Sequence, residues 1–504
     1  MSELKTIKDL VYRSAELYGD IAFLSEYKKK KFIDVSFSQF KSSCDSVAVW
    51  IQKYFSEKVH IAVIGTTSSE YLTAWFGIQC SGNVSVPLDT TNNVEKIADE
   101  ILRSDSAAVF LDDKHVADIP MFKKVCPNVK CFIHLSKKCD DMLFLGDIIE
   151  EYKDQTPVGD VNEEDISAIL FTSGTTGVSK GVMLTHANLI DNTTCQENEA
   201  TKGQKILSVL PIHHVYCFTC DILCSLYYGV TVCINDSLMH IVRNLSVFKP
   251  NFATFVPMIA GTILNKMQLA AEKNPDKLAI GKQVFGENFE ILYSGGAYLS
   301  PDIINGYKEF GIEIAQGYGM TECSPRICTG VRDCPKTDSV GKIVNGCEVK
   351  IVDGEIWAKS KSVMKGYYKN PEETAKSLTP DGWLMTGDLG YKDDDGFLYI
   401  TGRKKNLIIL SNGENVSPEE LENQFAFFMP IKEMVVYAKD GIIMAQIYPD
   451  PDYKSDDIQA EITAKVDEVN ETFPQAKRIV KVIFRDREFV KTASKKIIRA
   501  KINE

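Results

Sequence analysis

The ten residues from Thr172 to Gly181, TSGTTGVSKG, have the composition of an anion-binding loop. Three glycines let the backbone approach an anion closely, and five hydroxyl side chains can donate hydrogen bonds to its oxygens. Lys180 adds a positive charge. The glycine–lysine spacing differs from that of a Walker A loop. These residues alone predict an anion-binding loop, with a polar surface turn as the alternative.

A cluster of histidine and cysteine residues contains the side-chain types that ligate zinc. The sequence around it is mostly apolar, and buried free cysteines are common in such segments. A zinc site usually brings a second paired knuckle, which the sequence lacks. We therefore expect a buried helix here, with a zinc site as the alternative. The cluster consists of His213, His214, Cys217, Cys220 and Cys224.

The first half of the chain alternates apolar β-branched runs with amphipathic segments, which is the pattern of α/β layering. The last predicted strand leads directly into the glycine-rich loop, and a further strand and a helix follow the loop. The predicted fold class is therefore α/β, with a large N-terminal domain of layered sheets and helices. Strands are predicted at residues 60–65, 82–89, 108–111 and 166–172.

The pattern changes after residue 386, where two strands joined at Asp395 and Gly396 precede a basic segment and a third strand. A helix is expected to begin at Ser417 as N-cap, followed by Pro418 and, three residues from the cap, Glu420. Further strand-like runs and an amphipathic helix near residues 458–473 complete a small α+β domain. We place the boundary between a large domain, residues 1–401, and a small mobile domain, residues 402–504.

The composition limits the classes of partner. A length of 504 residues predicts more than one domain, and a net charge of −12 argues against a sequence-independent nucleic-acid-binding protein. The start of the chain does not resemble a secretory signal, and no segment is apolar over the length of a membrane span. The 14 cysteines are scattered along the chain, so we expect a reducing compartment, the cytoplasm.

The glycine-rich loop resembles the signature of the acyl-adenylate-forming (AMP-binding) superfamily, which includes acyl-CoA synthetases, amino-acid adenylation domains and luciferases. The usual form is TSGTTGxPKG, and this chain departs from it only at Ser179. That departure is expected to loosen the turn without removing a phosphate contact. The resemblance extends from about residue 10 to the end of the chain. It implies that ATP is bound by Thr172, Ser173, Gly174, Thr175, Thr176, Gly177 and Lys180.

Two further motifs resemble the segments that surround the nucleotide in this superfamily. In QGYGMTECSP, Tyr318 would stack on the adenine, Thr321 would donate a hydrogen bond to the α-phosphate, and Glu322 would hold Mg²⁺. YSGGAYLSPDI would lie along the adenine. The remaining ATP-binding positions in these two motifs are Gly295, Gly296, Ala297, Gly317 and Gly319.

The motifs TGDLG and GRKKN resemble the ribose site and the hinge. By that resemblance, Asp388 would accept hydrogen bonds from both ribose hydroxyls, with Arg403 beside the same ribose. Lys405 would be the residue about which the small domain rotates.

The C-terminal segment KTASKKIIRAK resembles the superfamily's TxSGK ending and makes Lys496 the catalytic lysine, with Lys495 in place of the usual glycine. The implied reaction begins when a substrate carboxylate attacks the α-phosphorus of ATP and pyrophosphate leaves. Lys496, Thr321 and the Mg²⁺ held by Glu322 would stabilise the charge that develops. The small domain would then rotate, and a thiol would displace AMP to form a thioester.

The acyl pocket is expected to include His214, where the superfamily often has an aromatic residue or histidine beside the reacting carboxylate. Amino-acid-activating relatives carry an aspartate here, because a buried ammonium needs a partner. This chain has no acidic residue until Asp221, which disfavours an amino acid. The sequence PIHHVY and the segment after residue 405 most resemble fatty and long-chain acyl-CoA synthetases, so a fatty acid is the expected substrate.

The expected acceptor is coenzyme A, and the phosphopantetheine arm of an acyl carrier protein is the alternative. A basic patch at residues 477–481 could dock such a carrier. A catalytically impaired nucleotide or acyl sensor, suggested by Ser179 and Lys495, and an adenylating module that acylates an amine or oxygen are further alternatives. The expected ligands are thus a small-molecule carboxylic acid, ATP, Mg²⁺ and coenzyme A, with no nucleic acid and no membrane span.

Overall fold

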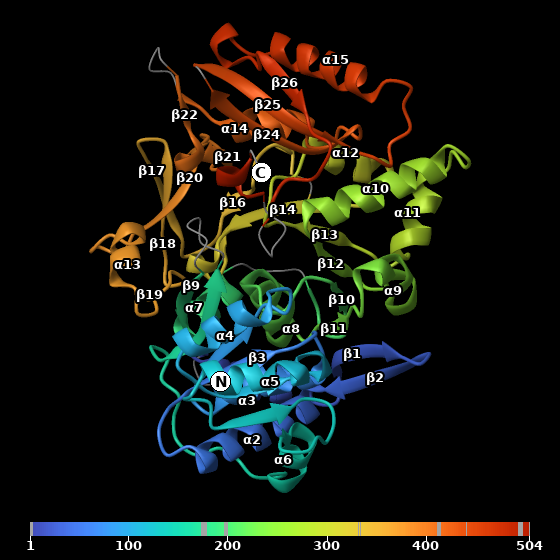
Figure 1. Cartoon of the computed structure of the whole chain (residues 1–504). Helices are drawn as coiled ribbons and strands as arrows, with labels where there is room; N and C mark the ends of the chain where they lie inside the picture. Colours follow the sequence, from blue (N-terminus) through green and yellow to red (C-terminus); the bar gives the residue numbers. More distant parts are fainter. Residues whose placement is uncertain are drawn as a thin grey trace.

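The computed structural model describes residues 4–172, 179–195, 200–330, 332, 334–410, 415–439, 441–491 and 497–502. Figure 1 shows the large N-terminal part, coloured from blue to yellow, with the smaller C-terminal part in orange and red at one end of it. The architecture is mixed α/β, as the sequence predicts.

An eight-stranded sheet, in the order β19-β9-β8-β4-β3-β5-β6-β7, carries the glycine-rich loop between β8 and β9. β3 to β7 pair in parallel with their neighbours, and β8 pairs antiparallel with β9. The four predicted strands are confirmed as β3, β4, β5 and β8. The strands are β3 (His60–Ile64), β4 (Val84–Leu88), β5 (Ser106–Leu111), β6 (Cys131–His134), β7 (Leu143–Phe144), β8 (Ile166–Thr172), β9 (Lys180–Thr185) and β19 (Gly366–Tyr367).

The helices in this part of the chain lie between the strands in sequence, as expected for parallel pairing, which needs crossover connections. They are α2 (Phe37–Tyr54), α3 (Ser69–Cys80), α4 (Val94–Arg103), α5 (Ile119–Val125) and α6 (Leu145–Glu151), with the 3₁₀ turn η1 (Asp113–Asp118).

A nine-stranded sheet, in the order β16-β15-β14-β13-β12-β10-β11-β1-β2, forms the other large layer. β10 to β14 are parallel at its centre, and β15 turns back antiparallel to β14. The strands are β1 (Ala22–Lys28), β2 (Lys31–Ser36), β10 (Lys205–Ser208), β11 (Thr231–Ile234), β12 (Phe252–Phe255), β13 (Ile291–Ser294), β14 (Ile314–Gly319), β15 (Arg326–Thr329) and β16 (Lys342–Ile343).

One hydrophobic core joins the two large sheets. At its centre the ring of Trp75 on α3 stacks on Phe218 of the π-type helix η2, with ring centroids 4.0 Å apart. The predicted helix is confirmed for the cysteines, since Cys217 and Cys220 lie in η2 and Cys224 begins α8. His213 and His214 lie in the turn before the helix, where His214 is exposed, so the prediction is wrong for the two histidines. The remaining helices of this part are α1 (Ile7–Tyr18), α7 (His186–Thr194), η2 (Cys217–Leu223), α8 (Cys224–Tyr228), η3 (Leu238–His240), α9 (Ile241–Phe248), α10 (Pro257–Ala271), α11 (Lys277–Phe285), α12 (Pro301–Glu309) and η4 (Thr321–Cys323).

A four-stranded antiparallel sheet, in the order β17-β18-β20-β21, follows. The predicted hairpin is confirmed, because β20 and β21 pair across the turn that contains Gly396 at φ 83°. The predicted third strand is β22, which pairs with β23 in a separate ribbon. The elements are β17 (Glu348–Val352), β18 (Glu355–Lys359), α13 (Pro371–Ser377), β20 (Leu384–Lys392), β21 (Leu398–Arg403), η5 (Lys404–Asn406), β22 (Ile408–Ile409) and β23 (Asn415–Val416).

The C-terminal part has a hydrophobic core of its own around a three-stranded sheet. The predicted strands and the helix expected near residues 458–473 are confirmed. These elements are α14 (Pro418–Glu422), η6 (Asn423–Phe425), β24 (Ile431–Lys439), β25 (Ile442–Pro449), α15 (Ile458–Glu471), η7 (Gln475–Lys477), β26 (Lys481–Phe484) and η8 (Arg499–Lys501).

The predicted start of α14 is confirmed, with Ser417 at the N-cap and Pro418 as the first helical residue, but the capping bond is absent. Ser417 occupies the N-cap position, but its side chain accepts no hydrogen bond from the helix backbone. Its hydroxyl instead donates to the Glu419 carboxylate at 3.0 Å, so the expected capping box does not form.

No helix among the described residues combines the length and the apolar character needed to cross a bilayer.

Candidate active site

A cavity of about 1270 Å³ brings most of the predicted residues together. It lies beside the carboxyl ends of β8, β13 and β14, the usual place for a ligand in an α/β sheet. Ala297 and Asp388 do not line it, although Asp388 contacts two residues that do. The predicted residues that line the cavity are Thr172, Lys180, His214, Gly295, Gly296, Gly317, Tyr318, Gly319, Thr321, Glu322, Arg403 and Lys405.

Part of the predicted site lies outside the described residues. This part comprises Ser173, Gly174, Thr175, Thr176 and Gly177 of the loop, together with Lys495 and Lys496.

The two ends of the glycine-rich loop are held by the β8–β9 ladder, in which Thr172 pairs with Lys180. The Lys180 ammonium forms an ion pair with Glu373 of α13 and lies 4.8 Å from the centre of the Tyr367 ring. Hydrogen bonds from Lys180 and then Lys376 lower the pKa of Glu373 to about 2. The lysine expected to meet a phosphate therefore has a carboxylate partner in this structure.

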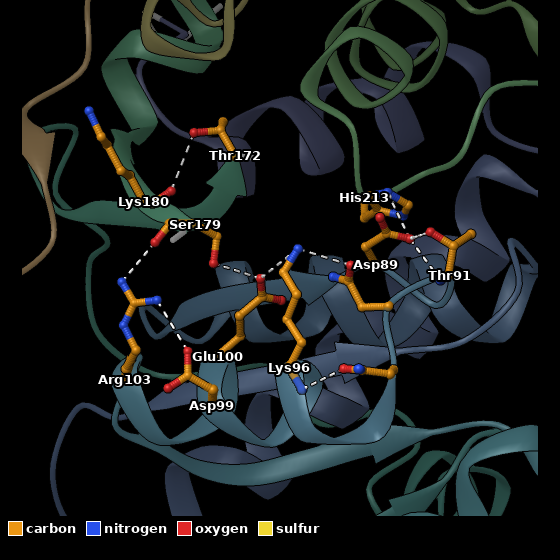
Figure 2. A network of polar contacts seen from close by, with 12 residues as sticks. Asp89, Thr91, Lys96, Asp99, Glu100, Arg103, Thr172, Ser179, Lys180 and His213 are labelled. Carbon is orange, nitrogen blue, oxygen red and sulfur yellow. Dashed lines mark hydrogen bonds and ion pairs between the residues drawn. The ribbon is translucent and has the colours of Figure 1, made fainter. Parts of the chain in front are cut away.

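Ser179, the departure from the superfamily signature, is buried and anchored to α4 (Figure 2). Its hydroxyl donates a 2.8 Å hydrogen bond to Glu100 Oε1, and its carbonyl accepts one of 2.7 Å from Arg103. Burial raises the pKa of Glu100 to about 7. The loosening expected from the loss of proline is therefore offset, because the serine is fixed by hydrogen bonds instead.

The segment after β13 approaches its neighbours too closely for a side chain. A Cβ atom on Gly295 would lie 3.1 Å from the Tyr216 hydroxyl and 3.2 Å from the Gly317 carbonyl. The absence of a side chain thus lets β13 and β14 converge at the cavity wall.

Tyr318, Asp388 and Arg403 form one polar group across two sheets, in which Asp388 is buried and Arg403 is exposed. We call it the nucleotide end of the cavity. The Tyr318 hydroxyl donates to Asp388 at 2.7 Å, and Arg403 Nε lies 2.8 Å from the other carboxylate oxygen. Asp388 and Arg403 face each other in the β20–β21 ladder. The TGDLG and GRKKN motifs therefore meet the QGYGMTECSP motif in space, as the resemblance implies.

Glu322 is positioned by the turn after β14 and is mostly buried. Its Oε1 accepts a 2.7 Å hydrogen bond from Tyr367, whose ring also contacts Lys180. Mg²⁺ commonly binds proteins through one or two carboxylates, with phosphate oxygens and water completing its shell. Glu322, one of the carboxylates that line the cavity, fits that chemistry.

The His213 and His214 rings lie with their centroids 4.2 Å apart at the cavity wall. His213 Nε2 is 3.6 Å from Asp89 Oδ1, which also accepts hydrogen bonds from Thr91 (Figure 2). Burial lowers the pKa of His213 to about 3, so the ring is neutral near pH 7. A neutral ring is compatible with a neighbouring acyl group.

The histidine–cysteine cluster does not assemble as a metal centre among the described residues. Cys217 instead lies beside Ser208, and the Asp221 carboxylate accepts hydrogen bonds from Ser208 and Thr254 at 2.8 and 2.6 Å. The zinc alternative therefore has no support in the described structure.

The sequence analysis did not predict three of the side chains that organise this site: Glu100, Tyr367 and Glu373. Each lies far along the chain from its partner, 79, 45 and 193 residues away respectively. They belong to no motif that we identified, so no signal in the single sequence marks them.

The fold is that of known adenylate-forming enzymes. The crystal structure of the anthranilate CoA ligase AuaEII in complex with anthranoyl-AMP matches with a TM-score of 0.87 and 20% identity, over 99% of this chain and 97% of that one. The long-chain-fatty-acid–CoA ligase FadD15 of Mycobacterium bovis is 27% identical, covering 75% of this chain and 70% of its own length. The 4-coumarate-CoA ligase 1 of Narcissus pseudonarcissus is 25% identical, covering 77% and 74% respectively.

Models of two protein families match the chain. The AMP-binding enzyme model matches residues 11–368, and the AMP-binding enzyme C-terminal domain model matches residues 405–504. The chain therefore belongs to the AMP-binding enzyme family. It is an acid–thiol ligase of that family.

Proposed function

We propose that this enzyme uses ATP and Mg²⁺ to convert a carboxylic acid into an acyl-adenylate and then transfers the acyl group to coenzyme A. The products are acyl-CoA, AMP and pyrophosphate. The observation that carries the proposal is the single cavity lined by Tyr318, Thr321, Glu322 and Arg403 beside the end of the glycine-rich loop. Solved relatives in complex with AMP and with ATP and magnesium support the choice of nucleotide and metal.

In this proposal each residue acts on a stated part of the reactants. Tyr318 contacts the adenine, Asp388 and Arg403 bind the ribose, and Thr321 donates to the α-phosphate. Mg²⁺ held by Glu322 would neutralise phosphate charge. Lys496 would stabilise the pentacoordinate phosphorus that forms when the carboxylate attacks.

The loop residues from Thr172 to Lys180 would bind the leaving pyrophosphate through backbone N–H groups and hydroxyls. For Lys180 this requires an exchange of partners, because its ammonium now pairs with Glu373. The anionic phosphates would compete with that carboxylate for the same cation.

Relatives of this chain are named for more than one class of acid. A fatty acid is favoured by relatives named as long-chain-fatty-acid–CoA ligases, whereas others are named for 4-coumarate. An amino acid is disfavoured because Asp221 does not line the cavity and already binds two hydroxyls. His214 would lie beside the reacting carboxylate. We further propose a cytoplasmic location, which the 14 free cysteines support.

The proposal is tested by ATP–pyrophosphate exchange over a panel of fatty, aromatic and amino acids, with mass detection of products after addition of coenzyme A. Exchange with an acid, followed by its CoA thioester, is the expected result. Exchange without any thioester to coenzyme A or a phosphopantetheine carrier protein would indicate an amine or oxygen acceptor. A protein without exchange on any acid would be a sensor, contrary to the proposal.

The small domain, residues 402–504, is proposed to rotate about Lys405 between the two half-reactions. The Lys405→Pro variant should keep pyrophosphate exchange and lose about 10-fold or more in thioester formation, because proline restricts the backbone at the hinge. Lys404→Ala is the control at the neighbouring position. It removes a side chain that pairs with Glu355 at 2.9 Å and leaves the backbone at Lys405 unrestricted. A thioester rate equal to that of the wild type would contradict the hinge assignment.

A further inference from the structure

An arginine without a described carboxylate partner lies in the wall of the cavity. Arg326 is the first residue of β15 and lines the cavity. Its Nε donates to Asn192 Oδ1 at 3.3 Å, and its Nη2 donates to the Asn192 carbonyl and lies 3.5 Å from Cys224 Sγ. Nη1 has no hydrogen-bond partner among the described residues. We call Cys224, Ser225 and Arg326, which line the cavity, its acyl end; Asn192 contacts Arg326 but does not line the cavity.

The groups that surround this guanidinium are neutral. Burial raises the pKa of the Cys195 thiol to about 11 and raises those of Cys220 and Cys224 as well, so all three thiols are protonated near pH 7. Arginine stays charged at any such pH. No carboxylate in the described part of the chain lies within ion-pair distance of Arg326. A buried charge without a counter-ion is costly, so a ligand that supplied an anion here would be stabilised.

A second polar group with spare hydrogen-bonding capacity lies at the same end. Ser225 follows Cys224 on α8, is buried in the fold and lines the cavity. Its hydroxyl has no hydrogen-bond partner among the residues that the structure describes. A methyl-terminated acyl chain would satisfy neither this hydroxyl nor Arg326 Nη1.

Arg326 is held close to the residues expected to carry the reaction. It pairs with Gly319 in the β14–β15 ladder, and Thr321 and Glu322 lie in the turn between these two strands. A Cβ atom on Gly319 would come within 1.9 Å of the Pro325 carbonyl oxygen, so a glycine is needed for this close approach. Arg326 therefore lines the cavity from β15, the neighbour of β14, and β14 carries the segment that is expected to bind the nucleotide.

The contacts that hold Arg326 in the fold use Nε and Nη2 of its guanidinium. The Asn192 carbonyl lies in the last turn of α7, where a cation is favourable because the helix dipole is negative there. That contact uses Nη2, and Asn192 Oδ1 accepts from Nε. The two N–H groups of Nη1 are not used by any of the described residues and are available in this structure to a ligand.

We propose that the acid activated by this enzyme carries a second carboxylate, remote from the reacting one, and that Arg326 binds it. A guanidinium matches the geometry of a carboxylate, and such charge-assisted hydrogen bonds are among the strong ones. The Ser225 hydroxyl donates to the same group. This inference rests on the proposed adenylation reaction and replaces the methyl end of a fatty acid with an anionic end.

The test compares matched acids on the full-length enzyme by ATP–pyrophosphate exchange. The diacids succinate, glutarate, adipate and suberate are each paired with their monomethyl esters and with the monoacids of equal length. Wild-type enzyme should prefer at least one diacid over its ester by about 10- to 100-fold in kcat/KM, the range typical of a hydrogen bond to a charged group. Arg326→Met should abolish that preference, and Arg326→Lys should retain part of it.

Two controls separate specificity from folding. Arg326→Met should keep exchange with the monoacids, which reports that the fold and the adenylation chemistry are intact. Arg478→Met removes an exposed arginine of the small domain and should change neither kind of substrate.

The possible results separate a failure of the inference about Arg326 from a failure of the proposed adenylation function. A wild-type enzyme that uses the monoacid or the ester as well as the diacid, or an Arg326→Met variant that keeps the diacid preference, overturns the inference and leaves the adenylation function standing. The absence of exchange with every acid in this panel and in the fatty, aromatic and amino-acid panel overturns the proposed function and the inference with it.

Discussion

The two ends of the cavity differ in how their charges are balanced. At the nucleotide end Asp388 is bonded by both Tyr318 and Arg403, and nearby Lys180 is paired with Glu373. At the acyl end the Arg326 side chain contacts an amide side chain, a carbonyl and a thiol among the described residues. Among the residues that the structure describes, the charges of the first set are paired, whereas Arg326 in the second has no carboxylate partner.

This difference indicates what each end contributes. Paired charges fix the side chains before a ligand arrives, which reduces the reorganisation that binding requires. An arginine that has no counter-ion among the described residues favours an anionic ligand, because an unpaired charge away from water costs free energy. In the proposed function, the nucleotide end binds the ligand that the family shares, and the acyl end selects the acid.

The largest effect is expected from the catalytic charge that the C-terminal segment supplies to the nucleotide end. Lys496→Ala should reduce adenylation by about 10²–10³-fold while nucleotide binding survives, because one pre-placed donor to the transition state is lost. Pyrophosphate exchange and nucleotide titration measure the two properties. Lys495→Ala is the matched control, and equal activity of Lys496→Ala and wild type would remove Lys496 from the mechanism.

A smaller effect is expected at the contact that positions Glu322. Tyr367→Phe removes the 2.7 Å hydrogen bond to this carboxylate and should raise the Mg²⁺ concentration at half-maximal activity by about 10-fold. Tyr391→Phe, at an exposed tyrosine that stacks on Tyr399, is the control. An unchanged Mg²⁺ dependence in Tyr367→Phe would mean that the nucleotide end does not depend on this preorganisation.

The smallest effect is expected at the anchor of the glycine-rich loop and depends on pH. Burial raises the pKa of Glu100 to about 7, above the value near 4.5 of an exposed glutamate. Protonation therefore stabilises the fold: the contribution is complete below pH 4.5 and is lost as the pH rises through 7. Its full size is about 3 kcal/mol, of which about 2 kcal/mol is lost between pH 5.5 and 8.

Thermal unfolding between pH 5.5 and 8 measures this contribution, and Glu100→Gln should flatten the pH dependence over that window, which spans the pKa of about 7. Glu95→Gln changes an exposed residue of the same helix and should leave the dependence as it is. A Glu100→Gln variant with the wild-type pH profile would show that Glu100 does not titrate in this range.

The sequence by itself determined the layers and the family. Periodicity predicted β3, β4, β5 and β8 together with the small α+β part, because burial on a sheet or helix leaves a local, regular pattern. The ordered motifs identified the positions expected at the nucleotide end. The helix start at Ser417 and Pro418 was predicted correctly, but the Ser417 hydroxyl donates to Glu419 and does not cap the helix backbone.

Only the tertiary structure decided which side chains meet. The Ser179–Glu100, Lys180–Glu373 and Tyr318–Asp388 contacts join residues 79, 193 and 70 positions apart, and no local pattern specifies such pairs. The same holds for Arg326, which in the sequence is one basic residue among 57. Among the described residues Arg326 has no counter-ion inside the cavity, because of the way α7, α8 and β15 pack around it. The inference about the acid rests on that packing.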